Sequence, residues 1–273
     1  MKRIFIAFSL VAAAFALTNC AQKESIAPVQ EETQEYLSFE VVANLPAETK
    51  TYNDGLSTKW SDDDRIKVIF TKSDGESDEA DNAFTYAGSG KFVGKLEREI
   101  IYGFLSSFAG GSLTAVYPYD ADGTVPSSTV QTGYDSMAHL AGANCPLSGT
   151  VKVSWSQDWL ELIRTQKYTI PELTLEHTVS VVEVSVVNNT ASAIEVSEVD
   201  FLVDGAVKST TVVAEAGALA AGETAKVYIV VEPAAYAESQ LSFQVNDTFE
   251  KVIEATEVTF TAGLIKQVNF VVE

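Results

Sequence analysis

Apolar residues recur at every second position along most of the chain, and this period of two constrains the fold more than any other feature. Leu37, Phe39 and Val41 share one face of such a segment, while polar side chains occupy the opposite face. Alternation of this kind is typical of a β-strand with one buried face. The same pattern recurs at residues 66–70, 182–186, 199–203, 227–231, 241–245 and 268–272.

Turn-forming pairs lie between these segments, among them Asp74-Gly75, Asp122-Gly123, Asp204-Gly205 and Ala262-Gly263. Short strands joined by such turns predict an all-β protein built from antiparallel β-sandwiches. The chain is rich in loops, Tyr, Pro and Gly before about residue 170, and its strands are valine-rich and closely spaced afterwards. This shift predicts two tandem sandwich domains, at residues 36–170 and 171–273.

Two stretches interrupt the period of two. Apolar residues recur every four positions at 96, 100, 104 and 108, and Trp155 and Trp159 show a helical spacing after Ser154. The first stretch predicts a helix or a loop with a helical turn, and the second predicts a short amphipathic helix, both as insertions in the first domain.

The N-terminus has the layout of an export signal. Lys2 and Arg3 precede an apolar run at residues 4–17, which is too short to span a bilayer, and Cys20 follows. Residues 1–19 resemble a bacterial lipoprotein signal, which would leave Cys20 as the acylated first residue of the mature chain. An ordinary signal peptide followed by a chance cysteine is the alternative. Residues 20–35 are polar and include Pro28, and they predict a flexible tether.

The charge of the chain argues against several classes of partner. The formal net charge is −20, and it becomes −22 once Lys2 and Arg3 are removed with residues 1–19. Nucleic-acid binding requires clustered Lys and Arg, so we expect no nucleic-acid partner. Adsorption to anionic lipid is also disfavoured, so the membrane link should be made by acyl chains on Cys20. Cys145 is the other cysteine, and we expect it to be a small buried core residue.

Five short motifs occur in a fixed order behind the signal: Thr49-Lys50-Thr51, Trp60 with Asp64 and Ile66, Tyr117-Pro118-Tyr119, Tyr134-Asp135-Ser136-Met137, and Leu173 to His177. In this order they resemble the fimbrillin-like family, whose members are lipoprotein subunits and accessory proteins of the type V pili of Gram-negative anaerobes. The resemblance covers nearly the whole mature chain and implies transthyretin-like sandwiches. It places the protein at the outer membrane, on the cell surface or in the fimbrium.

The resemblance also implies assembly by exchange of β-strands with other pilus subunits. Leu37, Phe39 and Val41 mark the strand that a protease would remove, and Val268, Phe270 and Val272 mark a strand that could be donated. An ordinary last strand of the second domain is the alternative for the latter. Stalk subunits of the family have an arginine after the first strand, whereas here Lys50 is the candidate cleavage site. Without cleavage the protein would stay anchored, as basal or accessory subunits do.

A surface lipoprotein that binds glycans or nutrients is the alternative function, because sugars stack on flat rings. Tyr102, Tyr117, Tyr119, Tyr134 and Trp159 are its candidate residues, and a host receptor or glycan is a partner under either reading. We expect no enzyme, because the motifs of hydrolases, zinc proteases and phosphate-binding loops are absent from the sequence. We also expect no cofactor and no metal, since the carboxylates at residues 62–64 lack the spacing of an EF-hand calcium loop.

Overall fold

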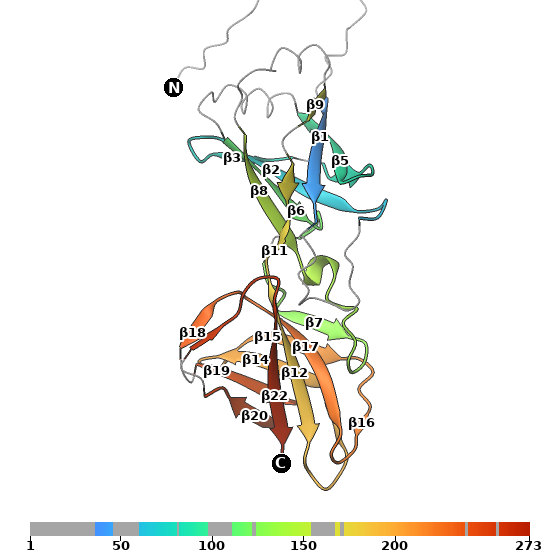
Figure 1. Cartoon of the computed structure of the whole chain (residues 1–273), viewed down its shortest axis with the longest axis vertical. Helices are drawn as coiled ribbons and strands as arrows, with labels where there is room; N and C mark the ends of the chain where they lie inside the picture. The colour runs from blue at the N-terminus through green and yellow to red at the C-terminus, as the bar shows by residue number, and fades with distance from the viewer. Residues whose placement is uncertain are drawn as a thin grey trace, which may run out of the picture. The chain divides into compact units, whose positions relative to one another are not determined.

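The computed structural model of the chain describes residues 36–45, 60–80, 82–97, 111–121, 124–153, 167–169, 172–237, 240–254 and 257–273 (Figure 1). β-strands are the dominant element of these residues, and one short 3-10 helix, η1, covers Gly142–Asn144. No helix within these ranges has the length and hydropathy needed to cross a bilayer.

Ten strands form the sheet of the N-terminal half: β1 (Tyr36–Asn44), β2 (Arg65–Thr71), β3 (Ser77–Glu79), β4 (Phe84–Tyr86), β5 (Lys91–Glu97), β6 (Gly111–Tyr117), β8 (Leu147–Val153), β9 (Lys167–Thr169), β10 (Leu173–Thr174) and β11 (Glu176–His177). Their order is β10-β1-β5-β4-β2-β6-β8-β11, with β3 paired to β2 and β9 paired to β1. The two ends of this order, β10 and β11, are consecutive in the chain and are separated by Leu175 alone. Residues 173–177 therefore pair with β1 through β10 and with β8 through β11. The sheet therefore closes on itself around its core.

Aromatic side chains dominate the core of this half, because the alternation along β1, β2, β4 and β5 points large rings inward. Phe39, Phe70, Phe84 and Phe92 are all buried, together with aliphatic residues of β2, β6 and β8. Rings of this size bury large apolar areas, which is the main stabilising contribution that a sheet can make.

Two facing sheets form the C-terminal half. The first has the order β17-β12-β22 and the second the order β20-β19-β14-β15-β7. The bounds are β7 (Ser128–Gln131), β12 (Ser180–Asn188), β13 (Ile194–Glu195), β14 (Glu198–Val203), β15 (Ala206–Val213), β16 (Ala218–Leu219), β17 (Thr224–Val231), β18 (Ala235–Ala237), β19 (Leu241–Val245), β20 (Phe249–Val252), β21 (Glu257–Thr259) and β22 (Ile265–Val272). Valine from both sheets fills the space between them, with Phe201, Phe243 and Phe270.

A segment from earlier in the chain packs against the C-terminal sheets. Residues 124–145 contribute β7, which pairs in parallel with β15, and then Leu140 and Cys145, which bury against Val181 and Tyr228. Gln131 is fully buried and holds this segment in place: its Oε1 accepts from the Tyr228 backbone N–H at 2.9 Å, and its Nε2 donates to the Lys226 carbonyl at 3.0 Å.

The all-β sandwich fold predicted from the alternation is confirmed. Some pairings are parallel, namely β1 with β9 and β10, β7 with β15, and β12 with β22, and these depend on contacts between distant segments. Both expected helical insertions lie mostly outside the described residues, although Leu96 is buried in β5. The domain boundary near residue 170 stays a prediction. β7, from the sequence before that boundary, lies in a sheet with strands from after it.

Candidate functional site

Strand β1 lies between strands that are remote from it in the sequence. One edge pairs antiparallel with β5 from Tyr36 to Val42, and the other edge pairs in parallel with β9 and then with β10. The backbone groups of β1 therefore have partners on both sides. A strand with two neighbours leaves a slot with two hydrogen-bonding walls when it is removed, instead of a bare edge.

The apolar face of β1 is built into the N-terminal core. Phe39, Val41 and Ala43 have exposed fractions of 1%, 0% and 0%. The Phe39 ring meets the rings of Phe70 and Phe84 edge-on, with centroids 5.6 and 6.3 Å apart. Leu37 pairs with Leu96, but its side chain lies outside the described ones. Of the three residues proposed to mark a removable strand, Phe39 and Val41 thus face the core.

The tryptophan and tyrosine–proline motifs meet at the end of β1. The Trp60 indole donates to the carbonyl of Ala43 at 3.0 Å, and its ring packs edge-on against Tyr117 and Phe92. The Tyr117 hydroxyl donates to Asp64 Oδ1 at 2.8 Å. Burial, helped by the hydrogen bond and charge of Asp64, raises the pKa of Tyr117 to about 12. These motif residues therefore clamp the C-terminal end of β1.

Asp64 serves the turn before β2. Its Oδ2 accepts from the Ser61 backbone N–H at 2.7 Å, and its carbonyl accepts from Tyr86. This is the capping role expected of a carboxylate in a turn. The cluster of carboxylates that comes closest to a metal site elsewhere in the described chain is Glu198, Asp200 and Asp247, whose oxygens lie within 4.8 Å of one another. Thr210 already donates to Asp200, and burial and the two neighbouring charges raise the pKa of Glu198.

The closing strand β22 is integrated into the C-terminal core. It pairs in parallel with β12 over eight residues, from Ile265 to Val272. Phe270 and Val272 are both 1% exposed, and Val268 is half-buried against the same core. No strand of the described chain pairs with the other edge of β22, where Lys251 Nζ donates to the Asn269 carbonyl at 2.6 Å. As the structure stands, β22 completes its own sandwich, and a donor role stays a prediction.

Several predicted residues can be placed individually. Cys20 and Lys50 lie outside the described residues, so the anchor and the cleavage site stay predictions. Cys145 is buried, as expected. Among the tyrosines proposed to stack on sugars, Tyr117 packs on Trp60, and the Tyr134 hydroxyl bonds to Gly217 and Val196 at 2.7 and 2.9 Å. Both are therefore engaged within the fold.

The two histidines are half-buried. His139 Nε2 lies 3.1 Å from the Tyr228 carbonyl, and burial lowers its pKa. Burial likewise lowers the pKa of His177, which lies at the end of β11.

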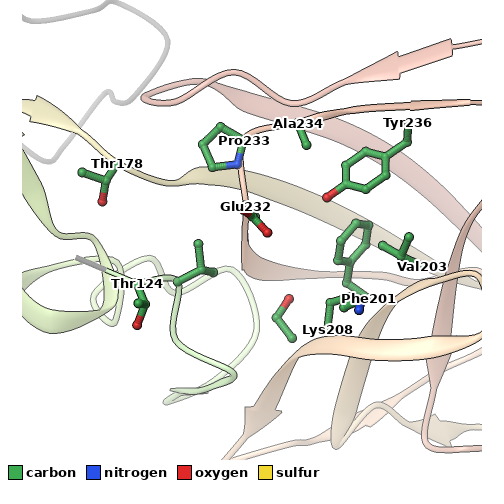
Figure 2. A pocket seen from close by; sticks show the side chains of 11 residues that line it. Thr124, Thr178, Phe201, Val203, Lys208, Glu232, Pro233, Ala234 and Tyr236 are labelled. Atoms are coloured by element: carbon green, nitrogen blue, oxygen red, sulfur yellow. The ribbon is translucent and has the colours of Figure 1, made fainter. Parts of the chain in front are cut away.

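A pocket of about 870 Å³ opens beside β14 and β18, and the sequence did not indicate it (Figure 2). Its lining includes Phe201, Lys208, Glu232, Tyr236 and Thr178. Figure 2 shows the Glu232 carboxylate and the Tyr236 hydroxyl pointing into the space between Thr178 on one side and Phe201 on the other. Tyr236 stands among alanines in the sequence, so no pattern there distinguishes it from a core residue. The nearest signal is Pro233, two residues after the end of β17.

No protein-family model matches the sequence, and no curated protein matches it. Among solved structures, the chain is similar to a fimbrial protein from Bacteroides ovatus (TM-score 0.38, 14% identity, covering 85% of this chain), and it spans only 47% of that protein's length. It is also similar to a protein assigned to cell adhesion from Bacteroides fragilis (TM-score 0.44, 11% identity, covering 86% of this chain and 92% of that one). A third similar structure is a fimbrial anchor protein from Porphyromonas gingivalis (TM-score 0.34, 13% identity, covering 80% and 83%). Identities and TM-scores this low do not assign the chain to a family.

Proposed function

We propose that this chain is a pilus subunit or accessory adhesin, anchored to the outer membrane through Cys20, whose N-terminal sheet accepts a β-strand from another subunit. The observation that carries the proposal is the position of β1 between β5 on one edge and β9 with β10 on the other. Removing β1 would leave backbone groups unpaired on both walls of a slot. The same removal would uncover the rings of Phe70 and Phe84, which Phe39 now covers.

The energetics favour refilling such a slot. Full burial of a Phe or Val side chain contributes about 1.5–3 kcal/mol, and an incoming strand with alternating apolar residues would recover this along with the hydrogen bonds. The Trp60 indole, which now holds Ala43, would be available to hold the end of the replacement strand. The ordered motifs of the sequence support the same proposal, since Trp60, Asp64 and Tyr117 all converge on this end of the slot.

Cleavage at Lys50 tests the acceptor role. Trypsin-like digestion of the purified chain should remove β1 and be followed by a ladder of multimers on unboiled gels. Lys50→Gln should abolish the product that begins at Thr51, whereas the matched change Lys59→Gln, in the same connection between β1 and β2, should leave that product unchanged. A trimmed monomer that unfolds without forming multimers would contradict strand acceptance.

Synthetic peptides separate the acceptor from the donor. A peptide of residues 36–44 should bind the trimmed chain and block the ladder, and the same peptide with Phe39→Ser and Val41→Ser should not. A peptide of residues 265–272 tests the donor strand marked by Val268, Phe270 and Val272. If only the first peptide binds, the chain accepts a strand and does not supply one through β22.

The lipid anchor is tested independently of assembly. Cys20→Ser should release the protein from washed outer membranes. Cys145→Ser is the matched control, since the chain has only these two cysteines and Cys145 is buried. Retention of the Cys20→Ser protein in the membrane would refute acylation at this position.

A further inference from the structure

The pocket beside β14 is shaped by an irregularity in the sheet. In the pairing of β14 with β15, Phe201 is opposite Ser209 and Leu202 is opposite Val207, so Lys208 is an extra residue. Such a β-bulge changes the direction of side chains, and bulges are over-represented beside functional sites. Here the two consecutive residues Lys208 and Ser209 both line the pocket, which a regular alternation would not allow.

An aromatic side chain is held at the pocket wall. The Tyr236 ring meets Phe201 and Phe260 edge-on, with centroids 6.1 and 5.8 Å apart, and it remains half-buried. These contacts fix the ring, so a ligand that stacks on it would not have to immobilise it. Burial, with a contribution from the Glu232 charge, raises the pKa of Tyr236, so its hydroxyl stays a hydrogen-bond donor at neutral pH.

Three polar side chains that line the pocket can form further hydrogen bonds. Glu232 and Lys208 are exposed, and neither forms an ion pair or side-chain hydrogen bond in the described part of the chain. The Ser209 hydroxyl is buried and has no hydrogen-bond partner among the described residues. A buried hydroxyl without a partner is unfavourable by about 1–3 kcal/mol, and unsatisfied groups of this kind are rare in folded proteins.

We propose that this pocket binds a neutral saccharide, with one sugar ring stacked on Tyr236 and its hydroxyl groups bonded to Glu232, Lys208 and Ser209. A pyranose ring has an apolar C–H face and a rim of hydroxyls that both donate and accept. Glu232 supplies an acceptor, Lys208 a donor and Ser209 either, so the lining matches that rim. The volume of 870 Å³ falls within the roughly 300–1,000 Å³ of small-molecule sites.

Charge balance separates a neutral sugar from other small ligands. The lining carries one cation, Lys208, and one anion, Glu232, so its charges cancel and a ligand with a net charge gains no net electrostatic attraction there. The pocket is formed by strands of the C-terminal half and residues 124–125, with none of β1 in its lining. Saccharide binding therefore does not depend on strand exchange, and either proposal can fail without the other.

Saturation-transfer difference NMR on the full chain in detergent micelles tests the proposal. The probes are the methyl glycosides of glucose, galactose and mannose, lactose as a neutral disaccharide, N-acetylneuraminate as an anion, glucosamine as a cation, and glycylglycine as a zwitterion. We expect signal transfer from at least one neutral sugar. Glu232→Gln should weaken its affinity about tenfold, as loss of a charged hydrogen-bond partner does. Tyr236→Ala should abolish the signal.

Two control variants distinguish a loss of binding from a general effect on folding. Tyr236→Phe keeps the edge-on ring contacts and should retain stacking with reduced affinity, and Glu250→Gln removes a comparable exposed carboxylate on β20 and should change nothing. The proposal is overturned if no neutral sugar gives a signal, if Glu232→Gln leaves the affinity unchanged while the signal persists in Tyr236→Ala, or if a charged or zwitterionic probe binds in preference.

Discussion

Both halves of the described chain are completed by a strand from near one end of the sequence, but they hold that strand differently. β1 has neighbours on both edges, whereas β22 pairs with β12 alone among the described strands. Loss of β1 would open a slot inside a sheet, and loss of β22 would only move the edge of a sheet inward to β12. The N-terminal half is therefore the one whose geometry is suited to accepting a foreign strand.

The cores of the two halves also differ in the side chains that contact the terminal strand. Beside β1, the rings of Phe70 and Phe84 both meet the ring of Phe39 edge-on, so loss of Phe39 would remove a contact from each of them. Beside β22, Phe270 belongs to a cluster in which valine is the commonest residue, and no ring contact of Phe270 with another aromatic residue is seen in the described part of the chain. The N-terminal core should therefore depend more strongly on its terminal strand.

Truncation of one ring in each half gives the largest expected effect. Phe39→Ala should lower the free energy of unfolding of the N-terminal half by about 3–5 kcal/mol, and Phe270→Ala should lower that of the C-terminal half by less, because β22 can shift at its free edge. Urea unfolding followed by tryptophan fluorescence reports the first half through Trp60, which packs against its core. Circular dichroism reports both halves.

The expected difference between the halves is contradicted if the fluorescence and circular dichroism transitions coincide in every variant. One cooperative transition would mean that the halves unfold together, so that neither strand belongs to a separate unit. Equal destabilisation by the two changes would show instead that the free edge of β22 allows no relaxation.

A substitution at one glycine should disturb the closure of the N-terminal sheet, with a smaller loss of stability. A Cβ at Gly149 in β8 would lie 2.2 Å from the carbonyl oxygen of Thr174, in the segment that joins β1 to β8. Gly149→Ala should therefore lower the fluorescence-detected stability by about 1–3 kcal/mol, as overpacking does. Gly217→Ala is the matched control, because nothing lies within 4 Å of its added Cβ. An unchanged midpoint for Gly149→Ala would show that residues 173–177 can move aside.

The strands were largely predictable from the sequence, because alternation follows directly from the geometry of a strand with one buried face. The segments around Phe39, Val184 and Phe270 are strands with their apolar residues inside, as expected. The parallel docking of β7 was not predictable, since it depends on Gln131 reaching backbone groups of β17, nearly 100 positions later. The pocket was missed for a related reason: the bulge at Lys208 depends on the register of two paired strands, which no local pattern encodes.

The smallest expected effect, and the one that compares the halves most directly, is alkaline destabilisation. Burial is the largest cause of a pKa of about 12 both for Tyr117 in the N-terminal half and for Tyr228 in the C-terminal half. The unfolded chain releases these protons near the ordinary tyrosine pKa of about 10, while the folded chain retains them. The contribution of these two tyrosines to the free energy of unfolding is thus fully present below about pH 10 and is lost as the pH rises towards 12.

Tyr117→Phe should flatten this loss in fluorescence-monitored unfolding at a series of pH values, and Tyr228→Phe should flatten it only in the circular dichroism signal. Tyr36→Phe, an exposed tyrosine, should leave both profiles unchanged, and an identical pH profile in all three variants would show that neither buried hydroxyl controls the alkaline transition of its half.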